Sequence, residues 1–351
     1  MSHPVDRRTF LRRSAIAVLG VTAAGLGAAN YVQRRRVPWD RDAFGPLGEA
    51  RVAVVRATSY SHGLEKTVLD GLRAVGADVG GARVLLKPNL VEYDPGTTIN
   101  TDPRLVAATV AAMRRLGAAE VIVAEGPGHR RDTQYVLTAT GLSSALADVD
   151  TAFVDLNTDA VTARRLRSHY TKLGSLWLPR SVVEADVVVS MPKMKTHHWA
   201  GVTLSLKNLF GCVPGRIYGW PKNALHLAGL EPAILDVAAA IRPALAIVDG
   251  IVGMEGNGPI SGTPVASGVL IFGNDPVAAD VVAARSMNVD PERVPYLMEA
   301  GRFLGQADLE QIRMEGEDPG QEATDFALLP TFAHLRVGSS AEPAPLPEAP
   351  G

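Results

Sequence analysis

The residues with the clearest capacity for chemistry lie between positions 192 and 215, in the stretch PKMKTHHWAGVTLSLKNLFGCVPG. It holds Lys193, Lys195 and Lys207 among mostly apolar residues, and no acidic residue occurs between Asp186 and Glu231. A buried cation without a partner is costly, so something must offset these charges. The three candidates are the protein's own carboxylates, a metal site and an anionic ligand.

Five apolar segments that we expect to be buried strands end in ionisable or amide groups. In an open α/β sheet, ligands bind beyond the carboxyl ends of the strands. The five ends are Lys87-Pro88-Asn89, Glu125-Gly126-Pro127-Gly128-His129, the stretch from Pro192 to His198, Asp249-Gly250 and Asn274-Asp275. Each end alone has a simple explanation, because a strand must stop in something polar, but the five together favour a site. We expect one cleft to be lined by Lys87, Glu125, Lys193, Asp249 and the loop 252–262.

The residue types suggest roles within this site. A lysine amine binds carboxylates and phosphates as a point charge, and a desolvated lysine can act as a base or form a Schiff base. The candidates for catalysis are Lys195, His197, Lys207, His226 and Asp249. The candidates for binding a substrate are Lys87, Asn89, Glu125, Lys193, Asn208, Glu255, Gly256, Gly258 and Asp280. In the alternative, the lysines pair inside the protein with Glu125, Asp249, Glu255 and Asp280.

A glycine-rich segment, GIVGMEGNGPISGTP at 250–264, directly follows Asp249. Glycines let backbone N–H groups approach an anion closely, so we expect a binding loop here. The nearby segment 201–211 fits a strand or a helix, and we favour a helix that ends at Gly211. In both conformations Thr203 and Lys207 share one side.

The histidines allow two kinds of chemistry. Adjacent side chains such as His197 and His198 point different ways on a strand or a helix, so we expect at most one of them in the site. His226 is the best second candidate. Histidine with carboxylates would suit a divalent metal, although no compact H-x-x-x-H spacing is present. A general acid or base role is the alternative, and the sequence identifies no cofactor.

The first 29 residues resemble a twin-arginine export signal. Arg7 and Arg8 precede an apolar run of residues 14–29 that is shorter than the ~20 residues needed to span a bilayer. We expect the twin-arginine translocase as a partner, cleavage after Ala29 and a periplasmic or other extracytoplasmic location. Because Arg34–Arg36 follow, a retained leader that anchors the chain to the membrane is the alternative.

Composition limits the remaining classes of function. The formal net charge is -2, and removal of the leader makes it more negative, which gives no support to nucleic-acid binding. The one cysteine, Cys212, can form no internal disulfide and cannot hold an iron–sulfur cluster alone. We expect a linker at 30–47, one α/β domain at 48–338 with a lobe boundary near residue 200, and a disordered Pro-rich tail at 339–351.

Apolar strands alternate with helical patterns along the central part of the chain. This alternation predicts an α/β fold with a mostly parallel sheet and helices on both faces, and with a cleft at the carboxyl ends of the strands. The expected strands are 51–58, 83–89, 120–126, 151–157, 175–179, 185–192, 244–250 and 268–275. The expected helices are 64–75, 101–117, 132–147 with a break near Gly141, 231–241 and 275–288.

Four ordered motifs resemble one known family. They are VLLKPNLV, PKMKTHHWAGVTLSLKNLFG, IVDGIVGMEGNGPISG and GNDPVAADVVA, and together they cover about residues 50–305. They are similar to the domain of unknown function 362 family, whose name implies no activity. Some members similarly carry a cluster-binding segment with several spaced cysteines, which this sequence lacks.

Two functions from different classes remain. The first is an enzyme that acts on a small anionic metabolite, a carboxylate or a phosphate, through the lysines and a histidine. The second is an exported protein that binds or assembles a ligand or a metal without catalysis. No second copy of the first half of the chain is visible, as a two-lobed periplasmic binding protein would show, and this favours the enzyme.

Overall fold

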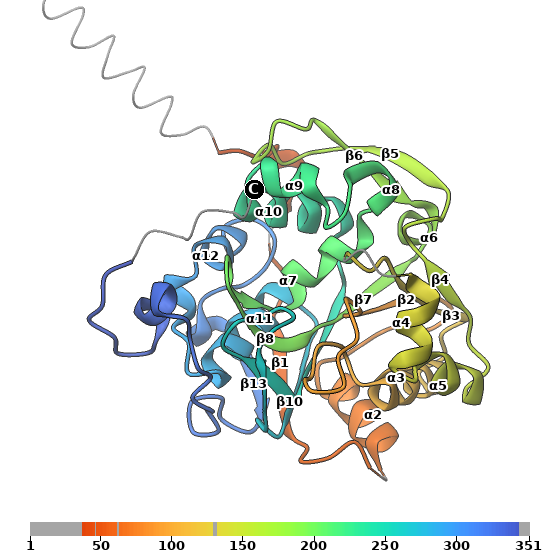
Figure 1. Cartoon of the computed structure of the whole chain (residues 1–351), viewed down its shortest axis with the longest axis horizontal. Helices are drawn as coiled ribbons and strands as arrows, with labels where there is room; N and C mark the ends of the chain where they lie inside the picture. The colour runs from red at the N-terminus through yellow and green to blue at the C-terminus, as the bar shows by residue number, and fades with distance from the viewer. Residues whose placement is uncertain (1–36, 46, 62, 129–131, 344–351) are drawn as a thin grey trace, which may run out of the picture. The chain divides into compact units, whose positions relative to one another are not determined.

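The computed structural model describes residues 37–45, 47–61, 63–128 and 132–343 (Figure 1). Arg41–Gly351 form the second of two units of the chain, and residues near 200 lie inside it. The predicted export signal at 1–29, the first part of the predicted linker at 30–36 and the end of the predicted tail at 344–351 fall outside the described residues. His129 falls outside them as well.

The second unit is built on a large, mostly parallel sheet, as the alternating pattern predicts. In spatial order its main strands are β13 (Arg313–Gly316), β1 (Arg51–Arg56), β12 (Val269–Gly273), β10 (Leu245–Glu255), β7 (Val187–Met191), β2 (Arg83–Pro88), β3 (Glu120–Glu125) and β4 (Phe153–Asp155). Neighbouring strands are parallel except on both sides of β12, which is antiparallel to β1 and to β10. The fold class is therefore α/β.

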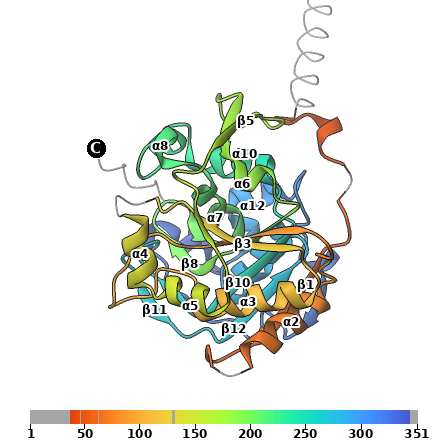
Figure 2. The same cartoon turned by 90° about the vertical axis from the view of Figure 1, so that its right-hand side faces the viewer.

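Helices cover both faces of this sheet, because both faces are apolar. Leu85 and Leu86 are consecutive residues of β2 that point to opposite faces, and both are fully buried. One face is covered by α2 (Leu64–Ala74), α3 (Pro103–Arg115) and α5 (Leu142–Asp148), and α4 (Thr133–Ala139) packs beside α5. The other face carries α10 (Leu230–Ile241), α11 (Pro276–Ser286) and α12 (Pro295–Ala300). In Figure 2, α3 and α5 lie below β3, and α10 and α12 lie above it.

The helix boundaries follow the local sequence signals. Asp102 caps α3 by accepting a hydrogen bond from the Arg104 N–H, with Pro103 as the first helical residue. Asp275 caps α11 in the same way, with Val277 and Ala278 as donors. The break expected near Gly141 separates α4 from α5, and this glycine has a positive φ of 79°.

The stretch 192–215, which holds Lys193, Lys195 and Lys207, contains more secondary structure than its sequence indicates. Residues Lys193–His197 form a further strand, β8, that runs parallel to β10 and antiparallel to β9 (Gly201–Thr203). A single helical turn, α7 (Ser205–Asn208), and a 3-10 turn at Leu209–Cys212 follow. The segment 201–211 is thus part strand and part helix, so each of the two predicted conformations holds for one half of it.

The predicted glycine-rich loop is shorter than expected. Its first part belongs to β10, which continues to Glu255, and β11 (Thr263–Val265) pairs with this extension. Gly250 and Gly253 serve close packing there, because a Cβ on either would lie within 3 Å of Met194 or Phe326. Only residues 256–262 remain as a loop.

The smaller elements lie outside the main sheet. A separate two-stranded sheet pairs β5 (Val161–Arg165) with β6 (Ser175–Pro179), and three short helices are α6 (Arg180–Val183), α8 (Gly215–Tyr218) and α9 (Asn223–Leu227). Short 3-10 turns occupy Arg41–Ala43, Pro291–Arg293, Leu309–Gln311 and Pro330–Leu335. Across the described ranges, no helix has both the length and the apolar character needed to span a membrane.

Candidate functional site

A cavity of about 780 Å³ opens where the ends of β2 and β3 meet β8, β9 and α7. Its walls combine positions from residue 87 to residue 226, together with Leu329, and the loop 256–262 contributes Asn257, Pro259, Ile260 and Ser261. The cavity brings together eight of the predicted site residues, namely Lys87, Asn89, Glu125, Lys195, His197, Lys207, Asn208 and His226. We call it the lysine cavity.

The first lysine of the cavity is paired inside the protein. Lys87, fully buried at the end of β2, donates to Glu125 at the end of β3, to Asn208 Oδ1 at 2.9 Å and to the Pro88 carbonyl at 2.9 Å. Burial raises the pKa of the Glu125 carboxyl, and the Lys87 ammonium acts against that rise. Gly211 makes this pair possible, because a Cβ there would lie 1.6 Å from Glu125 Oε1.

Lys195 has no carboxylate partner among the described residues, but its amine is fully engaged. It donates to Asn89 Oδ1 at 2.7 Å, to the Ile99 carbonyl at 2.9 Å and to the Pro259 carbonyl at 3.2 Å. Burial and the charge of Lys207 lower the pKa of this amine well below its ordinary value. With three acceptors and three N–H donors, Lys195 ties two loops together beside the cavity.

Lys207 differs from the other lysines of the cavity in having no polar partner among the described residues. Its amine makes no hydrogen bond or ion pair with any residue that the structure describes, and it lies 5.0 Å from the centre of the Phe210 ring. Burial, followed by the nearby charge of Lys87, lowers its pKa to about 8. A half-buried amine facing an open cavity is suited to receive an anion.

Both adjacent histidines line the cavity, against the expectation that at most one of them would. His197 is the last residue of β8, and the chain turns at 198–200, so the alternation of side chains along a strand no longer applies to His198. Their rings stack with centroids 4.8 Å apart. His226 faces Trp199 and Phe210 edge to face, at 5.7 and 5.9 Å.

Sequence reasoning missed Lys222, another buried cation of the cavity wall. Its amine donates to Asn157 Oδ1 at 2.8 Å, and burial lowers its pKa to about 8 although the charge of Glu125 opposes the change. Lys222 follows no strand, so the rule based on strand ends could not find it. Trp199 and Thr203 of the wall were not predicted as site residues either, although the sequence placed Thr203 on the same side as Lys207.

Lys193 and Asp249 lie outside the cavity wall and satisfy each other. Lys193 Nζ lies 2.6 Å from Asp249 Oδ2, and Tyr60 completes the group by donating to Asp249 Oδ1 at 2.6 Å. Asp249 also accepts from the backbone N–H of Asp102. For this lysine the internal ion-pair alternative describes the structure, and the two side chains connect the first residue of β8 to the middle of β10.

Four more predicted binding residues take part in backbone contacts outside the wall. Glu255 accepts from the Ala327 N–H, and Asp280 accepts from the Ser205 and Leu206 N–H groups at the start of α7. Neither carboxylate has a lysine partner in the described part of the chain. Burial raises the pKa of Asp280 to about 8. The backbone carbonyls of Gly256 and Gly258 accept from Thr196 and His198.

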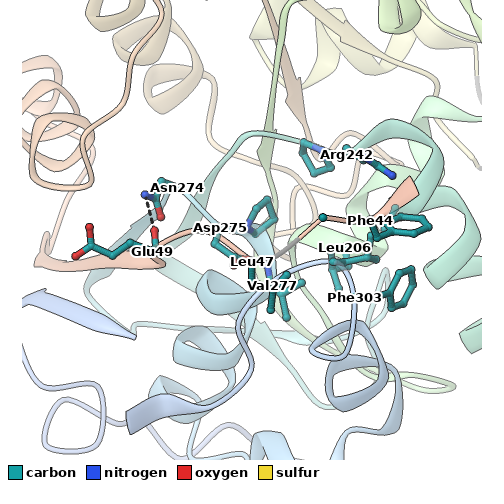
Figure 3. A pocket seen from close by; sticks show the side chains of 15 residues that line it. Phe44, Leu47, Glu49, Leu206, Arg242, Asn274, Asp275, Val277 and Phe303 are labelled. Atoms are coloured by element: carbon teal, nitrogen blue, oxygen red, sulfur yellow. Dashed lines mark hydrogen bonds between the residues drawn. The ribbon is translucent and has the colours of Figure 1, made fainter. Parts of the chain in front are cut away.

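One predicted strand end points away from this site. Because β12 is antiparallel to its neighbours, Asn274 and Asp275 lie at the opposite edge of the sheet, where they line a smaller cavity of about 260 Å³ (Figure 3). The Asn274 side chain accepts a hydrogen bond from the Arg51 N–H there and donates one to the Glu49 carbonyl. Asp275 caps α11 and also accepts from the Gln306 N–H, so the two side chains of this strand end have structural partners.

Among the described residues, no cluster of three or more histidine, cysteine, aspartate or glutamate side chains is arranged to hold a metal ion. Cys212 is buried next to the Lys87–Glu125 pair, and burial raises the pKa of its thiol to about 12. A thiol with so high a pKa is a poor nucleophile at neutral pH.

Comparison with known proteins finds a matching family model and a similar protein from Synechocystis sp.. A family model described as "Domain of unknown function (DUF362)" matches residues 84–285. Thylakoid-associated protein sll1697 from Synechocystis sp. is 32% identical over 257 residues, which cover 70% of this chain and 77% of that protein.

Two solved structures share a weaker likeness. The lactate racemase apoprotein from Thermoanaerobacterium thermosaccharolyticum has 15% identity and a TM-score of 0.43, over 68% of this chain and 57% of that one. A protein from Thermotoga maritima has 13% identity and a TM-score of 0.35, over 63% of this chain and 57% of that one. This chain thus spans a little over half of each, and likeness of this degree supports no statement about activity.

Proposed function

The chain belongs to the family described as Domain of unknown function (DUF362), and on the geometry of its lysine cavity we propose that it is an enzyme acting on a small organic anion. The anion carries a carboxylate or a phosphate, which the cavity lysines bind. A histidine of the wall then moves a proton to or from the bound molecule. The alternative is a protein that holds the same kind of ligand without changing it.

The observation that carries this proposal is the charge of the cavity wall. Its cationic or titratable nitrogen side chains are Lys87, Lys195, Lys207, Lys222, His197, His198 and His226. Glu125 is the one carboxylate among the described wall residues, and Lys87 already pairs with it. The positive charge of Lys207 is therefore not offset by a carboxylate of the wall, and a bound anion would offset it.

The histidines support catalysis in addition to binding. Burial lowers the pKa of His197, His198 and His226, and the charge of Lys207 adds to the effect on each of them. Neutral imidazoles near pH 7 are able to accept or relay a proton. A bound anion would partly cancel the charge of Lys207, so it would also raise these pKa values toward the working range of a general base.

Anion binding is tested by isothermal calorimetry and thermal melting with inorganic phosphate and with acetate. We expect either probe to bind and to stabilise the unaltered chain, and Lys207→Met to weaken binding by about ten-fold or more. The matched control is Lys66→Met, which removes an equal charge from an exposed i,i+4 pair with Asp70. Equal binding by Lys207→Met and Lys66→Met would overturn the proposal.

Catalysis is distinguished from simple binding by what happens to the ligand. Native mass spectrometry of protein exported by its own host identifies retained molecules, and elemental analysis of the same sample tests for a divalent metal. Proton NMR then follows a defined panel of small carboxylates and sugar phosphates in the presence of the protein. We expect at least one member to change, whereas tight binding with no chemical change would favour the non-catalytic alternative.

We also propose that the protein works outside the cytoplasm after export by the twin-arginine translocase. The support is the leader itself, in which Arg7 and Arg8 precede a short apolar run. The leader lies outside the described residues, so this part of the proposal depends on sequence alone.

A further inference from the structure

Strands β8 and β9 present one face of a two-stranded ribbon to the lysine cavity. Lys195 lies opposite Thr203 in this ribbon, and His197 lies two residues beyond Lys195, so all three side chains project from the same face. Thr196 points to the other face, where it donates to the Gly256 carbonyl at 2.9 Å. Lys207 joins the group from α7, four residues after Thr203.

The hydrogen bonds of His197 determine which of its ring nitrogens carries the proton. Nδ1 lies 3.0 Å from the Trp199 backbone nitrogen and 3.1 Å from that of Ala200. Both are N–H donors, so Nδ1 must be the accepting nitrogen, and the proton of the neutral ring sits on Nε2. His197 therefore offers the cavity an N–H donor.

His198 has the opposite arrangement. Its Nδ1 lies 2.6 Å from the backbone carbonyl oxygen of Gly258, which can only accept a hydrogen bond. The proton of the neutral ring is therefore on Nδ1, and Nε2 carries a free lone pair. Glycine is required at position 258, because a Cβ there would lie 2.1 Å from the Thr196 carbonyl oxygen.

Two more donors on the same wall lack partners. Thr203 Oγ1 is buried and has no hydrogen bond within the described structure, and the amine of Lys207 makes none either. A buried hydroxyl without a hydrogen-bond partner destabilises the fold unless a ligand supplies that partner. His197, Thr203 and Lys207 thus line one cavity, and three of their donor groups, His197 Nε2–H, Thr203 Oγ1–H and the Lys207 ammonium, have no acceptor among the described residues.

We propose that Thr203, Lys207 and His197 bind one anionic oxygen group of the substrate and that His198 acts as the general base beside them. In the proton-transfer step, His198 Nε2 takes a proton from the bound molecule and the ring becomes an imidazolium. The electron pair of the broken bond stays on the substrate, where the Lys207 ammonium offsets the added negative charge. This inference rests on the proposed function and assigns separate tasks to two adjacent histidines.

The protonation of the two rings is measurable without knowledge of the substrate. Two-bond proton–nitrogen NMR correlations on the full chain with ¹⁵N-labelled histidine report which ring nitrogen is protonated, and His197→Asn and His198→Asn assign the signals. We expect Nε2–H for His197 and Nδ1–H for His198 at pH 7.5. The reverse assignment for either ring would overturn the inference.

Asparagine variants separate the two tasks because asparagine reproduces the Nδ1 side of histidine and lacks the Nε2 side. In His197→Asn the amide oxygen can still accept from Trp199 and Ala200, and in His198→Asn the amide nitrogen can still donate to Gly258. We expect His197→Asn to weaken binding of inorganic phosphate by about ten-fold and His198→Asn to change it by less than about two-fold.

Thr203→Val is a second test variant. Valine keeps the shape of the threonine side chain, so we expect this variant to fold normally. We expect it to weaken phosphate binding and to add to the effect of His197→Asn. If phosphate binds the unaltered chain and both of these variants retain full affinity, the anion subsite is refuted. If neither phosphate nor acetate binds the unaltered chain, the proposed function fails, and the NMR result still decides the protonation of the two rings.

Discussion

Replacing Lys207 by methionine should stabilise the empty protein. Methionine keeps the apolar stem against Phe210 and removes the charged amine. In the folded chain the pKa of this amine falls from 10.5 to about 8, because burial and the charge of Lys87 disfavour its protonated form. At pH 7 the folded protein therefore carries a cation that the unfolded chain accommodates more easily.

The size of the effect follows from proton linkage. The difference of about 2.5 pH units corresponds to about 3 kcal/mol of unfolding free energy at most. Since the side chain keeps some contact with solvent, we expect a gain of about 1–2 kcal/mol, or about 2–4 °C in melting temperature. Because the unfolded chain binds more protons between pH 8 and pH 10.5, stability of the unaltered protein rises with pH in that window and the advantage of Lys207→Met shrinks.

The contrasting variant is Lys87→Met, which leaves Glu125 buried without its partner. We expect it to lose about 3–5 kcal/mol, because an uncompensated buried charge remains. Lys66→Met, an exposed control, should change stability by less than about 0.5 kcal/mol. If the two substitutions change the unfolding free energy in opposite directions, Lys207 serves to bind a ligand and Lys87 serves to stabilise the fold, although both line the same cavity.

The assay is urea and thermal unfolding of the three variants at pH 7 and pH 9 in a buffer free of small anions, and again with inorganic phosphate. Phosphate at ten times its dissociation constant should add about 1.4 kcal/mol to the unaltered protein and much less to Lys207→Met. The reasoning is refuted if Lys207→Met loses as much stability as Lys87→Met and phosphate does not stabilise the unaltered protein. Lys207 would then be an internal part of the fold.

Three other outcomes are expected. Sulfate, whose charge is constant over the range, should bind more weakly as pH rises through about 8, because Lys207 and Lys222 both lose their protons there, and calorimetry at several pH values measures this. Gly211→Ala should destabilise the fold by more than about 2 kcal/mol in urea unfolding, since its Cβ would displace Glu125, and a wild-type midpoint would contradict the packing argument. Changing Arg7–Arg8 to two lysines should leave the precursor in the cytoplasm, and normal export in cell fractions would exclude the twin-arginine route.

Local signals in the sequence predicted the architecture well. Strands that are apolar on both faces require helices on both sides, and the sheet with its two helical layers follows from that pattern. The caps Asp102 and Asp275 and the break at Gly141 depend on a few neighbouring residues, so they were readable without tertiary information. The direction of β12 was not, because an apolar strand has the same composition in either direction.

The sequence predicted the candidate site only in part, because the rule for strand ends could find residues at those ends and no others. Lys87 and Glu125 lie at the ends of the parallel strands β2 and β3, and Lys195 follows the end of β7, so the rule for strand ends brought them together. Lys222 escaped this rule because it follows no strand. His198 was excluded by the alternation of side chains along a strand, which no longer applies after His197 because the chain turns at 198–200. The place of Lys222 in the cavity wall depends on how the chain returns after β9, which no local pattern encodes.

The amino-acid sequence by itself determined that several lysines would be buried near few acids, because apolar neighbours and residue counts are properties of the chain. Only the tertiary structure decided which lysine meets a carboxylate. Lys87 reaches Glu125 across neighbouring strands β2 and β3, and Lys193 reaches Asp249 across β8 and β10, whereas Lys207 faces the cavity. Pairing of buried charges depends on strand order and register over long separations, and a few ångströms separate an internal ion pair from a site for an anion.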